Sequence, residues 1–355
     1  MNNDRIQEIL DLMEEARLDY FLISDPQSIA YCTGYYNDPH ERMFVFMVSK
    51  HGNHTLFMND LFYLEHDLGV NIVWHKDGQD AIQTIVDEMH FPGRIGIDKN
   101  WASHFLLDLM KKLPDAKYIN ASPCVDLVRM KKDLQEQVLM IESSKINDAV
   151  MEEIIPFIQE GVSEKQLAKK LDELFFNHHS TCYGAIVAFG KNAADPHHEN
   201  DDTLLRKGDC VLIDMGCVYK GYCSDMTRTF FYEGILEEEI KVYETVKKAN
   251  EAAEAMIKPG VKLSDIDKCA RKVISDEGYG KYFTHRLGHF IGRDVHEYGD
   301  VSSVNEMEVE EGMIFSIEPG IYLEGNFGVR VEDLVMVTKD GCQVLNSFTK
   351  DIYII

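Results

Sequence analysis

The chain has 355 residues, a formal net charge of −25 at pH 7 and 45% hydrophobic residues, so its length favours two domains. The negative charge argues against nucleic acids and anionic membranes as partners, and no apolar stretch has the roughly 18 residues that a membrane span needs. The N-terminal stretch lacks the basic and apolar regions of a signal peptide. Eight cysteines without a CxxC pair are typical of reduced thiols. These features predict a cytoplasmic enzyme.

The first part of the chain alternates helix and strand patterns. Apolar residues at helical spacing predict a helix over 5–17. Short apolar runs predict strands at 19–24, 43–49, 55–59, 71–74 and 94–98, with helices around the later ones. This alternation predicts an α/β domain over residues 1–125, which ends near Pro123, before a charged segment.

Longer helices and paired strands are predicted in the rest of the chain. The helices cover 134–159, 163–177, 237–257 and 264–277, and the strands lie within 181–188, 211–231, 313–323 and 328–338. Ser163 and Ser264 occupy N-cap positions, and Gln166 completes a capping box. Two halves, each of helices followed by strands, indicate a duplicated α+β unit over 126–355. Chance similarity between helix starts is the alternative.

Two aspartates interrupt strand-like runs in residues 210–231, CVLIDMGCVYKGYCSDMTRTFF. Asp is rare in strands, and burying an unpaired carboxylate is costly. If Lys220 and Gly221 form a two-residue turn, Asp214 faces Thr227 and Asp225 lies diagonally from Asp214 on the same face, roughly 7–8 Å away. Two carboxylates on a covered face must share a proton or a cation. The alternative is one turn cap and one solvent-exposed acid.

Further candidate ligands follow in the second half. HRLGHFIGRDVHE, from 285 to 297, holds three histidines, Glu318 ends an apolar strand in FSIEPG, and Glu332 stands inside VRVEDLVMV. Glu is depleted in strands, so these acids need a shared explanation. Two Asp, two Glu and one His suit Mn²⁺, Co²⁺, Fe²⁺ or Zn²⁺. Two divalent ions about 3.5–4 Å apart would neutralise four carboxylates and hold a shared water or hydroxide as nucleophile.

Four motifs, LIDMG…SDMTRT, GH-x-IG-x₃-HE, SIEPGIY and VRVED, resemble those of the pita-bread metallopeptidases, which include methionine aminopeptidase, aminopeptidase P and prolidase. They occur in the right order within 181–355. YCTGYYNDPHER, at 31–42, resembles the additional N-terminal domain of prolidase, aminopeptidase P and creatinase. The resemblance implies an α+β protein: an N-terminal α/β domain followed by a duplicated pita-bread catalytic domain. A homodimer is expected.

The resemblance also implies the ligands of two divalent ions, with Mn²⁺ expected and Co²⁺ or Zn²⁺ as alternatives. Asp225 and Glu332 would bridge the ions, and the full set is Asp214, Asp225, His289, Glu318 and Glu332. Glu318 would be the general acid and base for attack of a metal-bridging hydroxide on an Xaa–Pro bond.

The histidines of these motifs are expected at the substrate. The resemblance places His197 and His296 as catalytic histidines and His285 as a substrate contact. Other nearby histidines, His178, His179 and His198, are interpreted as surface residues or as residues behind the site.

The sequence departs from the family pattern at two positions. Relatives usually have Gly where Phe290 stands and an aliphatic residue where Arg293 stands. Phe290 is expected to narrow the pocket wall. No arginine directly follows the HE dipeptide, which leaves the anchor of the substrate carboxylate open among Arg293, His285 and Arg330. A cation at Arg293 would favour acidic or polar Xaa residues, and the loop 37–42, with His40, would reach over the active site of a partner subunit.

Together these observations predict an Xaa-Pro dipeptidase whose substrate is a small peptide with proline in second place. Aminopeptidase P, which acts on longer peptides with the same metal site, is the alternative. A metal-free relative such as creatinase and a pita-bread binding module without activity are two further alternatives, and the intact ligand set opposes both.

Overall fold

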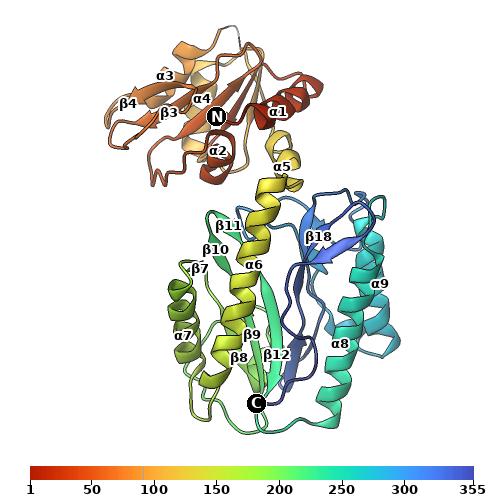
Figure 1. Ribbon diagram of the computed structural model, residues 1–355. Helices are drawn as coiled ribbons and strands as arrows, with labels where there is room; N and C mark the ends of the chain where they lie inside the picture. Colours follow the sequence, from red (N-terminus) through yellow and green to blue (C-terminus); the bar gives the residue numbers. More distant parts are fainter. Residues whose placement is uncertain (91) are drawn as a thin grey trace. The chain divides into compact units, whose positions relative to one another are not determined.

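Two structural units follow one another along the chain, Met1–Arg129 and Met130–Ile355 (Figure 1). They are seen in a computed structural model that describes residues 1–90 and 92–355. In the part of the chain so described, no helix is both long enough and apolar enough to cross a membrane.

The first unit is built on a six-stranded sheet in the order β4-β3-β2-β1-β5-β6. Neighbours are antiparallel at β1–β2 and β2–β3 and parallel at the other three junctions. Its elements in chain order are α1 (Asn3–Glu15), β1 (Tyr20–Ile23), α2 (Pro26–Thr33), β2 (Val45–Ser49), β3 (Thr55–Asn59), β4 (Asn71–His75), α3 (Ala81–Glu88), β5 (Arg94–Ile97), α4 (Ser103–Lys112), β6 (Lys117–Asn120) and α5 (Pro123–Met130).

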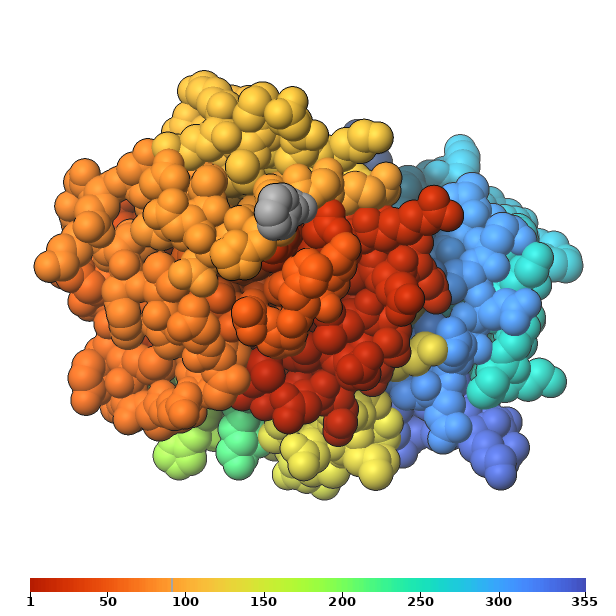
Figure 2. Space-filling view, turned by 90° about the horizontal axis from the view of Figure 1, so that it is seen from above, coloured from red at the N-terminus to blue at the C-terminus, as the bar shows by residue number. Residues whose placement is uncertain are grey.

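Helices cover both faces of this sheet, which is why β1, β2 and β3 are buried along their whole length. On one face α1 packs with Ile6, Ile9 and Met13. On the other, α3 packs with Ile82 and Ile85. In Figure 2 this unit presents one continuous surface from red to yellow. The predicted α/β organisation is confirmed; strand β6 was missed because it lies at the sheet edge and its side chains are only partly buried.

The second unit repeats one arrangement of two helices followed by strands. The helices α6 and α7 pack on each other and on β7, β8, β10 and β11, and α8 and α9 pack on each other and on later strands (Figure 1). The first half contains α6 (Leu134–Ile154), α7 (Glu164–Asn177), β7 (Thr181–Cys182), β8 (Ile186–Phe189), β9 (Cys210–Met215), β10 (Cys217–Tyr219), β11 (Tyr222–Cys223) and β12 (Met226–Phe231). The second contains α8 (Glu237–Met256), α9 (Leu263–Asp276), β13 (Gly288–His289), β14 (Asp300–Val301), β15 (Ile314–Ile317), β16 (Gly320–Leu323), β17 (Phe327–Arg330), β18 (Asp333–Val337) and β19 (Cys342–Val344).

The two predicted helix caps differ in outcome. The Ser163 hydroxyl accepts a hydrogen bond from the Gln166 backbone N–H, and Gln166 Oε1 accepts one from the Ser163 backbone N–H, so this capping box is confirmed. The cap at Ser264 is wrong, because α9 already begins at Leu263. The backbone N–H groups of Leu263 and Ser264 donate to carbonyls of Met307 and Asn305. The neighbouring segment therefore replaces a side-chain cap.

The hairpin predicted over residues 210–231 is confirmed. Lys220 and Gly221 have φ angles of 49° and 82°, as a type I′ turn requires. Asp214 pairs with Thr227, and Asp225 immediately precedes β12. This register brings both aspartates to the same cavity.

Candidate active site

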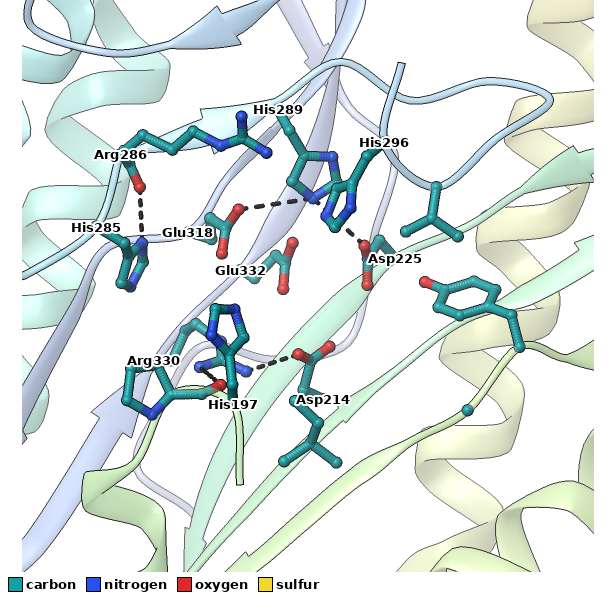
Figure 3. A pocket seen from close by; sticks show the side chains of 15 residues that line it. His197, Asp214, Asp225, His285, Arg286, His289, His296, Glu318, Arg330 and Glu332 are labelled. Carbon is teal, nitrogen blue, oxygen red and sulfur yellow. Dashed lines mark hydrogen bonds and ion pairs between the residues drawn. The ribbon is translucent and has the colours of Figure 1, made fainter. Parts of the chain in front are cut away.

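A cavity of about 600 Å³ in the second unit gathers acidic and basic side chains from both halves (Figure 3). Asp214 comes from β9 and Asp225 immediately precedes β12, whereas His289 lies in β13, Glu318 follows β15 and Glu332 precedes β18. All five predicted ligands therefore line one cavity. Other predicted site residues that line it are His197, His285, His296 and Arg330.

The centre of this set is tightly packed. Asp225, His289 and Glu332 each offer a ligand atom within 4.8 Å of the others. His289 Nε2 lies 3.6 Å from Asp225 Oδ2 and 3.6 Å from Glu318 Oε1. Thr227 Oγ1 donates to Glu332 Oε2 at 2.6 Å, which orients that carboxylate. The side chains thus converge on one point.

Three of these acids, Asp225, Glu318 and Glu332, have raised pKa values because burial disfavours their charged forms. Burial, followed by the charges of its neighbours, raises the pKa of Asp225 well above its usual value, and Glu332 behaves in the same way. Burial raises the pKa of Glu318 to about 7. A bound divalent cation reverses such shifts because it stabilises the ionised carboxylates.

His289 is held in the form that binds metals. Burial lowers its pKa to about 3, so the ring is neutral at pH 7. Nδ1 lies 3.3 Å from the Phe290 carbonyl, to which it donates, and Nε2 faces the carboxylates. A neutral ring fixed in this way is the usual metal ligand. Four carboxylates and one such imidazole therefore fit a centre for divalent ions.

Arg330, a predicted substrate anchor, already has protein partners. Its guanidinium donates to Asp214 Oδ2 at 2.6 Å, Thr227 Oγ1 at 3.0 Å and the Tyr322 hydroxyl at 3.0 Å. The residue is 3% exposed. These contacts favour a role in orienting Asp214 over one in binding the substrate carboxylate.

The three predicted substrate histidines lie around the ligands. The His296 ring meets the His289 ring edge-on, with centroids 4.2 Å apart. His285 Nε2 lies 2.9 Å from the Tyr322 hydroxyl, and burial lowers the pKa of His285 to about 4. Figure 3 shows the His197 ring pointing into the cavity from the side of Arg330. All three rings can therefore meet a bound peptide.

Three predicted residues lie elsewhere. The Arg293 guanidinium stands 5.4 Å from the Tyr222 ring centroid and is not among the lining groups. His40 belongs to the first unit, where its Nδ1 is 3.8 Å from an oxygen of the exposed Asp38. The prediction that Phe290 narrows the pocket wall is wrong, because its ring is fully buried.

The reason for the position of Phe290 is local. Its ring packs on Phe315 with centroids 5.3 Å apart. It also fills the space above Gly299, where an added Cβ atom would lie 2.8 Å from the ring. The bulky side chain therefore extends the core behind His289 and leaves the cavity open.

The lining residues that were not predicted include two with polar side chains, Tyr183 and Arg286. The Tyr183 hydroxyl donates to the Ser224 carbonyl at 2.8 Å and occupies the space that a side chain at Gly216 would need, since a Cβ there would lie 1.9 Å from it. The glycine at position 216, directly after the strand that carries Asp214, was the feature of the sequence that could have indicated a close-packed side chain there. Arg286 lies inside the HRLGH motif, beside His285, and its position there was the signal overlooked.

Comparison with known proteins gives a consistent result. Residues 138–339 match Metallopeptidase family M24, and residues 5–131 match the Creatinase/Prolidase N-terminal domain. An uncharacterized peptidase of Staphylococcus aureus (strain bovine RF122 / ET3-1) is 34% identical, over 98% of this chain and 99% of its own.

Solved structures share the whole fold. A dipeptidase from Pyrococcus horikoshii OT3 has a TM-score of 0.92 at 35% identity, covering 99% of this chain and 100% of that one. A recombinant prolidase from Thermococcus sibiricus has a TM-score of 0.94 at 32% identity, with 100% of both chains covered. The second unit is thus the duplicated pita-bread domain that was expected. The chain belongs to metallopeptidase family M24 and carries the creatinase and prolidase type of N-terminal domain.

Proposed function

We propose that this metallopeptidase hydrolyses the Xaa–Pro bond of dipeptides with two divalent ions, of which Mn²⁺ is the expected one. The observation that carries the proposal is that five side chains with metal-binding atoms line one cavity and that three of them, Asp225, His289 and Glu332, offer these atoms within 4.8 Å of one another. The full set is Asp214, Asp225, His289, Glu318 and Glu332. When bound, two such ions would supply a water of lowered pKa and polarise the scissile carbonyl.

Glu318 is the candidate proton carrier. Its carboxylate accepts a hydrogen bond from Ser316 Oγ at 3.2 Å, which holds it at the cavity wall. The prolyl nitrogen must gain a proton as the C–N bond breaks, because an amide anion is a very poor leaving group. Glu318 accepts the proton of the attacking water and returns it to this nitrogen.

His197 and His296 flank the peptide. Burial lowers the pKa of His296, so its ring is neutral at pH 7, with one nitrogen able to donate to the scissile carbonyl. Such a donor stabilises the negative charge that develops on the carbonyl oxygen. His197, on the side of Arg330, contacts the peptide from another direction (Figure 3).

Arg286 is the proposed anchor of the substrate carboxylate. It lines the cavity and lies near Glu318 and His289 (Figure 3). In the described residues its guanidinium has no hydrogen bond to another side chain, unlike that of Arg330. A free cation at this position favours a substrate that ends directly after proline, and hence a dipeptide.

The test is a comparison of kcat/KM for Xaa-Pro and Xaa-Pro-Yaa peptides with Mn²⁺, Co²⁺ and Zn²⁺. We expect at least a tenfold preference for the dipeptide. The reverse preference would identify an aminopeptidase P. Absence of hydrolysis with all three metals, in a protein that binds them by elemental analysis, would contradict peptidase activity on these substrates.

We also propose that the enzyme is a cytoplasmic homodimer. All eight cysteines are free thiols, which fits a reducing compartment. Sedimentation velocity should give twice the chain mass of 40.7 kDa; a monomer would contradict the dimer.

A further inference from the structure

A buried carboxylate lies behind the loop that carries His197. Glu164 is 0% exposed and stands in the first turn of α7, where the positive end of the helix stabilises its charge. Its two oxygens accept four hydrogen bonds. Oε1 accepts from Phe189 N at 2.8 Å and Asn192 Nδ2 at 2.9 Å, and Oε2 accepts from His198 Nε2 at 2.6 Å and Asp201 N at 3.1 Å.

These four hydrogen bonds connect the loop that carries His197 to β8, which pairs with the strand of the predicted metal ligand Asp214. Phe189 ends β8, and β8 pairs with β9 so that Ile186 stands opposite Asp214. His198 is the next residue after His197, and its side chain is 12% exposed. Glu164 therefore connects the chain on either side of His197 to β8, the strand that pairs with the strand holding Asp214.

His197 itself depends on its backbone for position. Its N–H donates to Asp195 Oδ1 at 3.0 Å, and His198 N donates to the Asp195 carbonyl at 3.2 Å. Within the described residues no hydrogen bond holds the His197 ring. The direction in which this ring points is thus set by the turn of residues 195–198. That turn is held by the pair of His198 and Glu164 at 2.6 Å and by a longer bond from the Arg330 guanidinium to the Pro196 carbonyl at 3.4 Å.

We propose that Glu164 and His198 are positioning residues that hold His197 in the peptide site, an inference that rests on the proposed function. Glu164, His198 and Asp201 also have the composition of a cation site. However, both Glu164 oxygens are already saturated by four donors, which is the arrangement of a hydrogen-bonding hub. His198, which was interpreted from the sequence as a surface residue or a residue behind the site, is therefore assigned a role in positioning His197.

The first test is a double-mutant cycle on kcat/KM for an Xaa-Pro dipeptide. His198→Ala should lower it about tenfold when His197 is present and less than twofold in the His197→Ala background, because the residue at 198 then has nothing to position. Equal losses in both backgrounds would indicate a general structural effect and overturn the proposal.

The second test is rescue. His198→Gln keeps an N–H donor that can reach Glu164, so it should retain at least half of the activity that His198→Ala loses. Glu164→Gln places an amide NH₂ against the donors of the hub and should match His198→Ala. A Gln variant at 198 that is as impaired as the Ala variant would contradict the hydrogen bond.

The third test needs neither metal nor substrate, so it separates this proposal from the proposed function. In metal-free protein labelled with ¹⁵N-histidine, the His197 signals are assigned by their loss in His197→Ala. They should shift or broaden in His198→Ala and stay in place in His198→Gln. Unchanged His197 signals in His198→Ala would overturn the proposal even if activity fell.

A matched control is available on the same helix. His178, at the C-terminal end of α7, pairs with Glu153 at 2.9 Å, and both side chains are partly exposed. His178→Ala removes another imidazole–carboxylate pair, 2.9 Å long against 2.6 Å for His198 and Glu164, far along the helix from Glu164. It should leave kcat/KM and the His197 signals unchanged; an effect equal to that of His198→Ala would show that the readouts are not specific.

Discussion

Two buried clusters of charge lie in the second unit, and they differ in their balance. The cavity cluster has four carboxylates around His289 and one buried arginine, Arg330. The second cluster has two acids and two cations, Glu254, Asp333, Arg228 and Lys350.

The second cluster is satisfied by the protein alone. Arg228 donates to Asp333 Oδ1 at 2.7 Å and to backbone carbonyls of Thr227, Glu332, Phe348 and Thr349. Lys350 Nζ lies 2.7 Å from Glu254 and 2.8 Å from Asp333. Equal numbers of opposite charges that pair with one another indicate a structural role, whereas an excess of buried carboxylates indicates a place for a cation.

The largest expected effect tests the unbalanced cluster. Asp225→Asn removes one converging carboxylate, so kcat/KM should fall by about 10²–10³-fold, because a metal contribution of several kcal/mol is lost. The free energy of unfolding of metal-free protein should not fall, since a repelling charge has been removed. A marked loss of stability without metal would contradict the assignment of this cluster.

The balanced cluster should respond in the opposite way. Lys350→Met leaves Glu254 and Asp333 without their shared cation and should cost about 3 kcal/mol of unfolding free energy, measured by urea denaturation. Lys247→Met is the control, because its partner Asp351 is exposed, and it should leave the stability nearly unchanged. Equal losses of unfolding free energy in Lys350→Met and Lys247→Met would contradict the structural role of the second cluster.

A smaller effect is expected when Arg286, the cation that lines the cavity, is replaced. Arg286→Leu should raise KM for Xaa-Pro dipeptides about tenfold, or about 1.4 kcal/mol, through loss of a carboxylate partner. It should change KM for Xaa-Pro-amide much less, because the amide lacks the charge. Arg293→Leu, outside the lining, is the comparison; a larger effect there would move the anchor to Arg293.

The smallest effect is a pH dependence of stability. Glu318 has a pKa raised to about 7, above the usual 4.5, so its contribution is present at acidic pH and is lost as pH rises through about 7. His285 and His289, with lowered pKa values, act in the opposite direction only below about 6.5. Between about pH 6.5 and 7.5, metal-free protein should lose stability relative to Mn²⁺-loaded protein and then level off at higher pH, and a constant difference across that window would contradict the raised pKa.

The sequence allowed the ligand strands to be predicted because strand geometry has a strict period of two. A two-residue turn at Lys220 and Gly221 was sufficient to place Asp214 and Asp225 on one face. Glu318 and Glu332 were recognised as unusual acids in apolar surroundings, although each lies just outside a strand.

Contacts between distant segments could not be predicted in this way. The failed cap at Ser264 depends on a segment more than forty residues later, and the burial of Phe290 depends on Gly299 and Phe315. The hub at Glu164 was missed because a Glu in the first turn of a helix is ordinary at the surface, and only the fold shows that this one is buried.

The origin of the ligands in both halves of the second unit has a kinetic consequence. Asp214 and Asp225 belong to the first half, and His289, Glu318 and Glu332 belong to the second. Ions held by all five would act as non-covalent cross-links between the halves, so separation of the halves would require their release. The lifetime of the folded enzyme should therefore lengthen with metal concentration, and loss of metal would expose the protein to proteolysis before it had unfolded at equilibrium.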